Sequence, residues 1–184
     1  MDGAPRSFSG VKGKKRLLNL IPLLFTLVGN GLTGHGVYTQ EVVGYHKGKS
    51  HVLAVHSIRQ KDRNNNSLFL APDAASSFRE MMVHAAKDGF HLDVLSAFRT
   101  HRQQAILKKK RGHLAAPPGW SNHQQGLSVD IGRTTRIIKG VRYRTILYWW
   151  LHRNAKTYGF YSDVIDEPWH WTFRRAKKEV EWYG

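Results

Sequence analysis

Apolar and polar residues alternate over the first part of the chain in the pattern of short strands. Residues 37–45 and 51–58, VYTQEVVGY and HVLAVHSI, are predicted to be two strands. The KGKS between them favours a hairpin turn, because lysine and glycine interrupt the apolar pattern. The polar run at 61–67, KDRNNNS, predicts a loop.

After Pro72, apolar residues recur at the spacing of a helix, and proline itself favours the first turn of a helix. Gly89 is the expected stop of this first helix. Residues 101–111 predict a second helix and residues 145–159 a third. The apolar face expected for the first helix comprises Phe78, Met81, Met82, Ala85 and Ala86.

Three further segments predict strands and one predicts a loop. FHLDVL at 90–95 alternates, LSVDIG at 127–132 has the character of a buried strand, and WHWTF at 169–173 is strand-like. AAPPGW at 115–120 predicts a loop, and the basic C-terminal tail predicts a last helix. Helices and strands mix without regular alternation and without an internal repeat, which favours an α+β domain.

The N-terminal segment, residues 1–36, differs in composition from the rest. A basic stretch precedes the apolar run LLNLIPLLFTLV, so residues 12–34 resemble a secretory signal, although no small-x-small cleavage site is clear. The alternative is a short buried element at the start of the domain. The run is too short for an ordinary transmembrane helix, so no stable membrane span is expected. Residues 37–184 are expected to form one domain.

The amino-acid composition limits the partners and the kinds of functional site that the chain can have. Lys plus Arg is 29 and Asp plus Glu is 13, which gives a formal net charge of +16 over 184 residues. This balance favours an anionic partner: nucleic acid, an anionic membrane or an acidic cell-wall polymer. Cysteine is absent, which excludes a disulfide scaffold, a zinc ribbon and a thiol nucleophile. A metal would therefore be held by His, Asp or Glu, and the chain has 11 histidines.

Two strings, SNHQQGLSVD and EPWH, hold the residues that are candidates for chemistry. A carboxylate inside an apolar strand, as Asp130 is, must be paired or metal-bound, because burying it alone is costly. Two histidines, His123 and His170, with this carboxylate would suffice for a zinc ion with an open fourth position. Glu167 stands three residues before His170 and would be near a water at that position. A buried Asp–His pair without metal is the alternative.

These strings resemble the S-x-H-x-x-G-x-x-x-D and E-x-W-H motifs of the zinc D-alanyl-D-alanine carboxypeptidases of the VanY type, in the M15 peptidase family. The string SAFRT at 96–100, followed by Gln103 or Gln104, is similar to the family's S-x-x-R-[ST]-x-x-x-Q segment. The resemblance covers roughly residues 70–173. It implies the fold shared with the hedgehog signalling domain: a small antiparallel sheet with helices packed on it, hedgehog/DD-peptidase-like.

The resemblance also implies roles, position by position. His123, Asp130 and His170 match the ligands of one zinc ion per chain. Glu167 matches the catalytic base, and its spacing to His170 favours it over Asp163 and Asp166. Arg99 matches an arginine that contacts substrate and stabilises charge on the reacting carbonyl. The positions expected on the substrate side of the cleft are Ser96, Gln104, Ser121 and Trp169.

The function implied is a zinc peptidase that acts on peptidoglycan stem peptides, most simply by removing a terminal D-alanine. An endopeptidase or L,D-carboxypeptidase with the same site stays open, as does a non-catalytic zinc-containing binding domain. Contact with an anionic cell-wall polymer would suit the charge. A nucleic-acid partner is not expected, since charge alone supports it and no zinc finger, phosphate loop or RNA-recognition signature is present. A periplasmic, secreted or cell-envelope location goes with this substrate.

Overall fold

The structure is a computed structural model, and it describes residues 38–175. The N-terminal segment with its candidate signal at 12–34, and the helix expected in the C-terminal tail, lie outside the described residues. Within 38–175, no helix has the length and apolar character needed to cross a membrane.

Nine strands, three α-helices and three 3₁₀ turns make up the described part. The strands are β1 (Thr39–His46), β2 (Lys49–Lys61), β3 (Ser67–Leu70), β4 (Val94–Ser96), β5 (Ser128–Ile131), β6 (Thr135–Ile138), β7 (Val141–Arg144), β8 (Phe160–Tyr161) and β9 (His170–Phe173). The α-helices are α1 (Pro72–Lys87), α2 (His101–Arg111) and α3 (Ile146–Asn154). The 3₁₀ turns are Gly112–Leu114, Asn122–Gln125 and Ala155–Tyr158.

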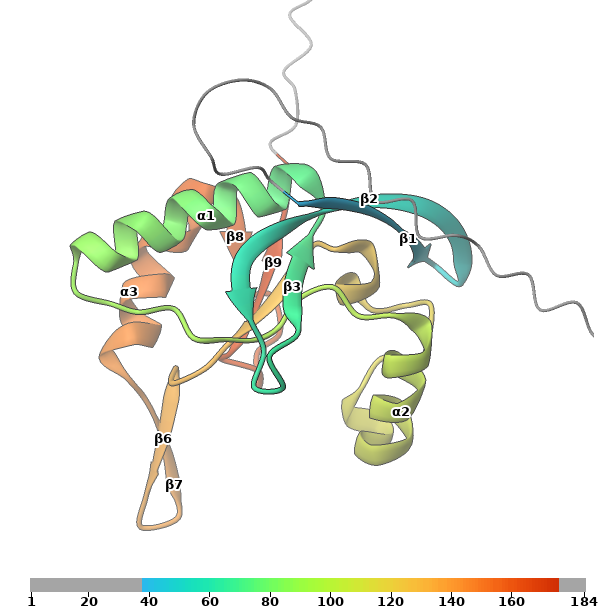
Figure 1. The fold of residues 1–184 in the computed structure, drawn as a ribbon. Helices are drawn as coiled ribbons and strands as arrows, with labels where there is room; N and C mark the ends of the chain where they lie inside the picture. Colours follow the sequence, from blue (N-terminus) through green and yellow to red (C-terminus); the bar gives the residue numbers. More distant parts are fainter. Residues whose placement is uncertain (1–37, 176–184) are drawn as a thin grey trace, which may run out of the picture.

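The strands form three small antiparallel sheets, in the orders β1-β2-β3, β4-β5-β9-β8 and β6-β7. Helix α2 and the β6–β7 hairpin extend from opposite sides of the body (Figure 1). Small antiparallel sheets combined with separate helices confirm the α+β class predicted from the sequence.

One stripe of α1 builds the core behind the four-stranded sheet. Ala74, Phe78, Met81 and Ala85 are fully buried and follow one another at helical spacing. The Phe78 ring meets Phe160 of β8 edge-on at 5.6 Å, and Phe160 lies 5.4 Å from Phe173 of β9. The core thereby fixes β9, the strand that begins at a candidate site residue. The predicted apolar face was wrong at Ala86, which is exposed, and Met82 is only partly buried, because both lie off this stripe.

The predicted hairpin between the first two strands is confirmed. Lys47 and Gly48 both have positive φ, 48° and 78°, as the two central residues of a type I′ turn do. The β6–β7 hairpin has the same turn at Lys139 and Gly140, with φ of 48° and 79°, but it was not predicted. Its strands are four residues long and largely exposed, so no buried periodicity marks them.

Other boundaries differ from the predictions. The strand predicted for 90–95 is confined to β4 at Val94–Ser96, and the third helix ends at Asn154 and tightens into the 3₁₀ turn Ala155–Tyr158 before Gly159. The short strands β3 and β8 were not predicted, because β3 begins inside the polar run that predicted a loop and β8 has only two residues.

Gly126 lies where the candidate site meets the body of the domain. Its φ is +66°, and a Cβ on it would lie 2.7 Å from the backbone nitrogen of Ala71. We expect Gly126→Ala to lower the free energy of unfolding by about 3 kcal/mol, because the cost of a strained φ and the cost of a steric overlap with the backbone add together. Gly89→Ala is the control, since Gly89 has φ +80° with nothing near its added Cβ. It should cost only about 1 kcal/mol. Urea unfolding measures both, and equal losses would contradict this account.

Candidate functional site

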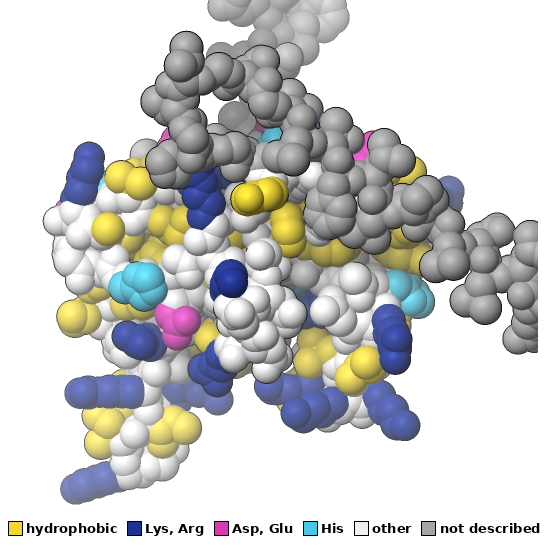
Figure 2. Space-filling view, viewed as in Figure 1, with side chains coloured by type: hydrophobic (Ala, Val, Ile, Leu, Met, Phe, Trp, Pro, Cys, Tyr) yellow, Lys and Arg dark blue, Asp and Glu magenta, His cyan; other side chains and the backbone are white. Residues whose placement is uncertain are grey.

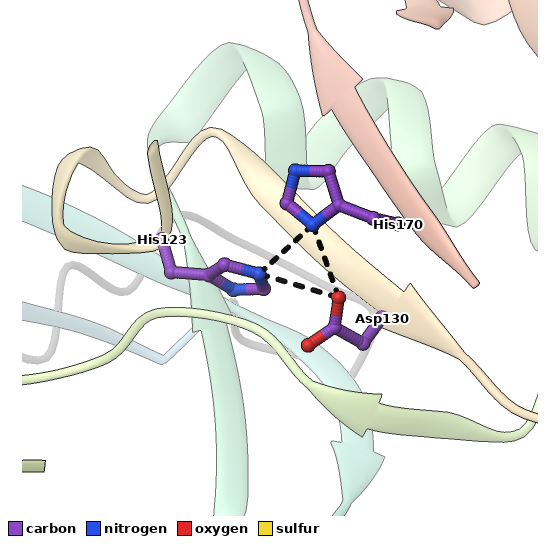
Figure 3. A group of neighbouring side chains, drawn as sticks. All are labelled: His123, Asp130 and His170. Atoms are coloured by element: carbon purple, nitrogen blue, oxygen red, sulfur yellow. Dashed lines mark hydrogen bonds and ion pairs between the residues drawn. The ribbon is translucent and has the colours of Figure 1, made fainter. Parts of the chain in front are cut away.

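Three side chains converge from a turn and two neighbouring strands (Figure 3). His123 comes from the 3₁₀ turn Asn122–Gln125, Asp130 from β5 and His170 from the start of β9. β5 and β9 pair antiparallel with Asp130 directly opposite His170. Residues directly opposite in such a pair present their side chains on the same face. The register therefore unites two residues that stand 40 positions apart in the sequence.

The ligand atoms of the three residues form a nearly equilateral triangle. Nε2 of His123 lies 3.2 Å from Nδ1 of His170 and 3.3 Å from Oδ1 of Asp130, and the last two atoms are 3.1 Å apart. Nitrogen and oxygen ligands at about 2.0–2.1 Å from a tetrahedral zinc ion lie about 3.3 Å from one another. The spacing of the triangle thus fits a small tetrahedral cation.

The tautomer of His123 is set by the backbone. Its Nδ1 lies 2.7 Å from the carbonyl oxygen of Ala97, which can only accept a hydrogen bond. Nδ1 therefore carries the proton, and in the neutral ring Nε2 turns a lone pair toward the triangle. A backbone carbonyl that orients an imidazole in this way is typical of metal-binding histidines.

His170 is oriented in the same sense by a longer chain of hydrogen bonds. The Thr172 hydroxyl donates to Oδ1 of Asp163 at 3.0 Å, so its oxygen accepts from Nε2–H of His170 at 3.1 Å. Nδ1 of His170 is then the unprotonated nitrogen. Two lone pairs and a carboxylate oxygen face one another with no proton between them, an arrangement that a divalent cation would stabilise.

Asp130 is the negative member of the group. Burial raises the pKa of its carboxyl group, but when the two imidazoles are protonated the charge of His123 and the hydrogen bonds from His123 and His170 outweigh burial and hold the pKa well below its ordinary value. Its second oxygen, Oδ2, accepts from Nη2 of Arg99 at 3.3 Å. The carboxylate is therefore ionised at neutral pH, as a metal ligand has to be.

Arg99 is held beside the triangle by three acceptors. Its Nη1 donates to Oε1 of Gln104 at 2.7 Å, and its Nη2 donates to Oγ of Ser96 at 3.1 Å and to Asp130. Burial lowers the pKa of the guanidinium, and the charges of Asp130 and Glu167 oppose that shift. Either Gln103 or Gln104 could follow the family's arginine segment, and Gln104 was the one expected at the cleft. Gln103 completes the capping box of α2 with Thr100, and Gln104 is the residue that contacts Arg99.

Glu167 lies at the edge of the group. Its Oε2 is 4.0 Å from Nδ1 of His170, and its side chain is 32% exposed. Asp163, one of its two competitors, is bound to Thr172 and lies 3.4 Å from Nη2 of Arg174. The other, Asp166, lines a separate groove with Arg142. Glu167 is thus the carboxylate left at the open side of the triangle.

Ser121 and Trp169 are the remaining predicted residues. Ser121 is buried, and its Oγ accepts from the backbone N–H of His123 at 3.3 Å, so it caps the turn that carries this histidine. Trp169 is partly buried, and the Arg142 guanidinium lies over its ring at 5.6 Å. Sequence reasoning missed Thr172 in its hydrogen-bonding role. Its position two residues after His170, on the same face of a strand, is a signal that could have found it.

Comparison with known proteins identifies the family of the chain. The chain is a small α+β domain in which a His–Asp–His group converges beside an arginine and a glutamate. The family model VanY, D-alanyl-D-alanine carboxypeptidase, matches residues 67–176. The chain therefore belongs to the VanY family, and the hedgehog/DD-peptidase-like fold implied by the resemblance goes with that membership.

Curated relatives are longer than this chain. A D-alanyl-D-alanine carboxypeptidase of Enterococcus faecium is 29% identical over 119 residues, which are 58% of this chain and 38% of the relative. The putative carboxypeptidase YodJ of Bacillus subtilis (strain 168) is 26% identical over 136 residues, 61% of this chain and 50% of the relative. The matched part of this chain thus spans half or less of their length.

Solved structures of the same kind resemble the chain more loosely. A vancomycin resistance D,D-pentapeptidase VanY in complex with Zn(II) is 22% identical with a TM-score of 0.47, over 62% of this chain and 76% of the other. The LdcB LD-carboxypeptidase is 26% identical with a TM-score of 0.46, over 62% of each chain.

The tautomer of His123 is open to direct measurement. We expect its proton on Nδ1 in the metal-free protein, because the Ala97 carbonyl requires a donor there. Long-range ¹H–¹⁵N correlation spectra, recorded at a pH where the ring is neutral, report the protonated nitrogen. His91, which is exposed, serves as the internal comparison. A proton found on Nε2 of His123 would contradict the lone-pair arrangement.

Proposed function

We propose that the chain is a zinc-dependent carboxypeptidase that removes the terminal D-alanine from peptidoglycan stem peptides. The observation that carries the proposal is the triangle of three acceptor atoms 3.1–3.3 Å apart, with Arg99 and Glu167 beside it. Membership of the VanY family supports the reaction, and the Enterococcus faecium relative bears the same description. Action on stem peptides implies that the chain works outside the cytoplasmic membrane, with residues 37–184 as its catalytic domain.

In this proposal, His123, Asp130 and His170 hold one zinc ion per chain. Three protein ligands leave the fourth tetrahedral position open, which is the arrangement of catalytic rather than structural zinc. When bound, zinc acts as a Lewis acid that polarises the scissile carbonyl and acidifies a water molecule. Thr172 and the Ala97 carbonyl keep both imidazoles in the tautomer that this binding requires.

Glu167 is the general base in this proposal. The carboxylate lies on the side of His170 that faces the triangle and is partly open to solvent, so a water and a peptide can both reach it. It takes a proton as the water oxygen adds to the carbonyl carbon of the terminal peptide bond. When the C–N bond breaks, the same proton passes to the nitrogen of the released D-alanine, so the carboxylate is regenerated.

Arg99 stabilises negative charge on the substrate. A guanidinium has five N–H donors, and the contacts to Ser96, Gln104 and Asp130 leave part of this fork for a carbonyl oxygen or a terminal carboxylate. Ser96 and Gln104 were expected on the substrate side of the cleft. Their bonds support the role of orienting Arg99, while Ser121 orients His123 and Trp169 forms a wall of the cleft.

Zinc binding tests the ligand set apart from activity. We expect the metal-free protein to bind one zinc ion, and His123→Ala to abolish that binding, because two protein ligands remain. Thr172→Val should weaken binding by about 10–100-fold, since it removes the partner that orients His170. Isothermal titration calorimetry measures both, with His91→Ala as the control histidine. Undiminished binding by His123→Ala would refute the ligand assignment.

The rate of peptide hydrolysis tests whether Glu167 is the general base. We expect Glu167→Gln to keep zinc and to lose about 10²–10⁴-fold in rate, because the amide cannot accept the proton. Glu80→Gln, the same change on the exposed face of α1, should leave the rate unchanged. Mass spectrometry of stem pentapeptides follows the release of one alanine. If Asp166→Asn rather than Glu167→Gln abolished turnover, the assignment would be wrong.

The same spectra separate the alternative functions. Cleavage confined to crosslinked or internal bonds would indicate an endopeptidase with this site, and removal of alanine only from a tetrapeptide would indicate an L,D-carboxypeptidase. Firm zinc binding without cleavage of any stem peptide would instead indicate a non-catalytic zinc-containing binding domain.

A further inference from the structure

A groove of about 440 Å³ beside the candidate active site is lined by residues of the β6–β7 hairpin, of α3 and of the segment that leads into β9. Its lining includes Arg142, Arg144, Trp149, Ile165, Asp166 and Pro168. Asp166 and Pro168 are the two chain neighbours of Glu167, so two of the groove's lining residues flank the proposed base in the sequence, although Glu167 itself does not line the groove. Nothing in the proposed mechanism uses it.

The hairpin is strongly basic. Residues 133–144 contain four arginines, one lysine and no acidic residue. Figure 2 shows these cations (dark blue) beside exposed hydrophobic side chains (yellow) at the lower left of the molecule. The register pairs Thr135 with Arg144 and Ile137 with Arg142, which places both arginines on one face of the hairpin. Arg136 lies on the other face, opposite Tyr143.

Aromatic rings hold the two guanidiniums of the groove. Arg142 lies over the ring of Trp169 at 5.6 Å, and Arg144 lies over the ring of Tyr148 at 4.8 Å. Stacking occupies the face of a guanidinium and leaves its N–H edge free to bind an anion. Within residues 38–175, neither arginine forms an ion pair with a carboxylate. Two oriented cations are thus available to a ligand.

Asp166 adds one negative charge to the same groove. In the described part of the chain it has no ion-pair partner within 4.0 Å, so it does not neutralise either arginine. A ligand carrying only an ammonium group would face two guanidiniums, and one carrying only carboxylates would face Asp166. A group that carries both an ammonium and a carboxylate can pair with Asp166 and with the two arginines at once.

We propose that this groove binds the zwitterionic amino-acid end of a substrate side chain, with its carboxylate on Arg142 and Arg144 and its ammonium on Asp166. This inference rests on the proposed function, and it specifies the substrate class: stem peptides whose third residue is a diamino diacid rather than lysine. That residue directly precedes the two terminal alanines, so its side chain lies close to Glu167 when the terminal bond is at the site.

Two synthetic pentapeptides test the inference. Both have the sequence L-Ala-γ-D-Glu-X-D-Ala-D-Ala, with X either meso-diaminopimelate or L-lysine, and they differ by one carboxylate. Calorimetry with zinc-loaded Glu167→Gln measures affinity without hydrolysis. We expect the diaminopimelate peptide to bind at least about tenfold more tightly, the effect of one charge-assisted contact. The double change Arg142→Gln, Arg144→Gln should remove this preference and leave the affinity for the lysine peptide at least as high.

Arg136→Gln is the matched control, since it removes an arginine from the opposite face of the same hairpin and should keep the preference. Equal affinities, a preference for lysine, or no binding of either peptide would overturn the inference. A preference for diaminopimelate without hydrolysis of either peptide by the unmodified protein would support the groove and refute the proposed function. Hydrolysis of both peptides without any preference would support the proposed function and refute the groove.

Discussion

Asp130 and His170 face each other because β5 and β9 pair in one register, and the candidate site depends on that pairing. A slip of one residue would turn the side chains of one strand to the opposite face. The register is held on the other face by Val129 and Trp171, which are opposite one another and buried in the core. Ser128 and Thr172, the next pair, share a hydrogen bond of 3.0 Å. The apolar core thus positions polar atoms that repel one another unless a cation lies between them.

The parts of the fold that the sequence could predict are those with a long period or a marked boundary. Helix α1 has a buried stripe and a proline at its start, and it begins at Pro72 as predicted; α2 occupies 101–111, the range that was predicted for it. The β6–β7 hairpin has neither, because its residues are exposed on both faces. Its one local signal is the Lys139-Gly140 pair, whose backbone repeats the turn at Lys47 and Gly48. Strand β8, with two residues, is too short for a period to appear.

At the site, the motifs predicted which residues meet, and the structure adds how they are oriented. The resemblance of the two strings to the family's motifs implied His123, Asp130 and His170 as ligands, whereas residue types alone left a buried Asp–His pair without metal as the alternative. The Ala97 carbonyl, which sets the tautomer of His123, could not be predicted, since a backbone carbonyl has no sequence signature. Thr172, which sets the tautomer of His170, was missed, although its position two residues after that histidine was a signal. Gln104 was the glutamine that the resemblance placed at the cleft, and the structure adds that it contacts Arg99 while Gln103 caps α2. The substrate roles expected for Ser96, Gln104 and Ser121 rest on the resemblance, whereas their contacts favour positioning roles.

The central claim is that the three acceptor atoms form a catalytic zinc site. The most direct test is a crystal structure of the zinc-loaded protein with anomalous data collected at the zinc edge. The account predicts one anomalous peak at about 2.0–2.1 Å from Nε2 of His123, Nδ1 of His170 and Oδ1 of Asp130, with a fourth position open to water. Zinc bound elsewhere, or a fourth protein ligand closing that position, would contradict it.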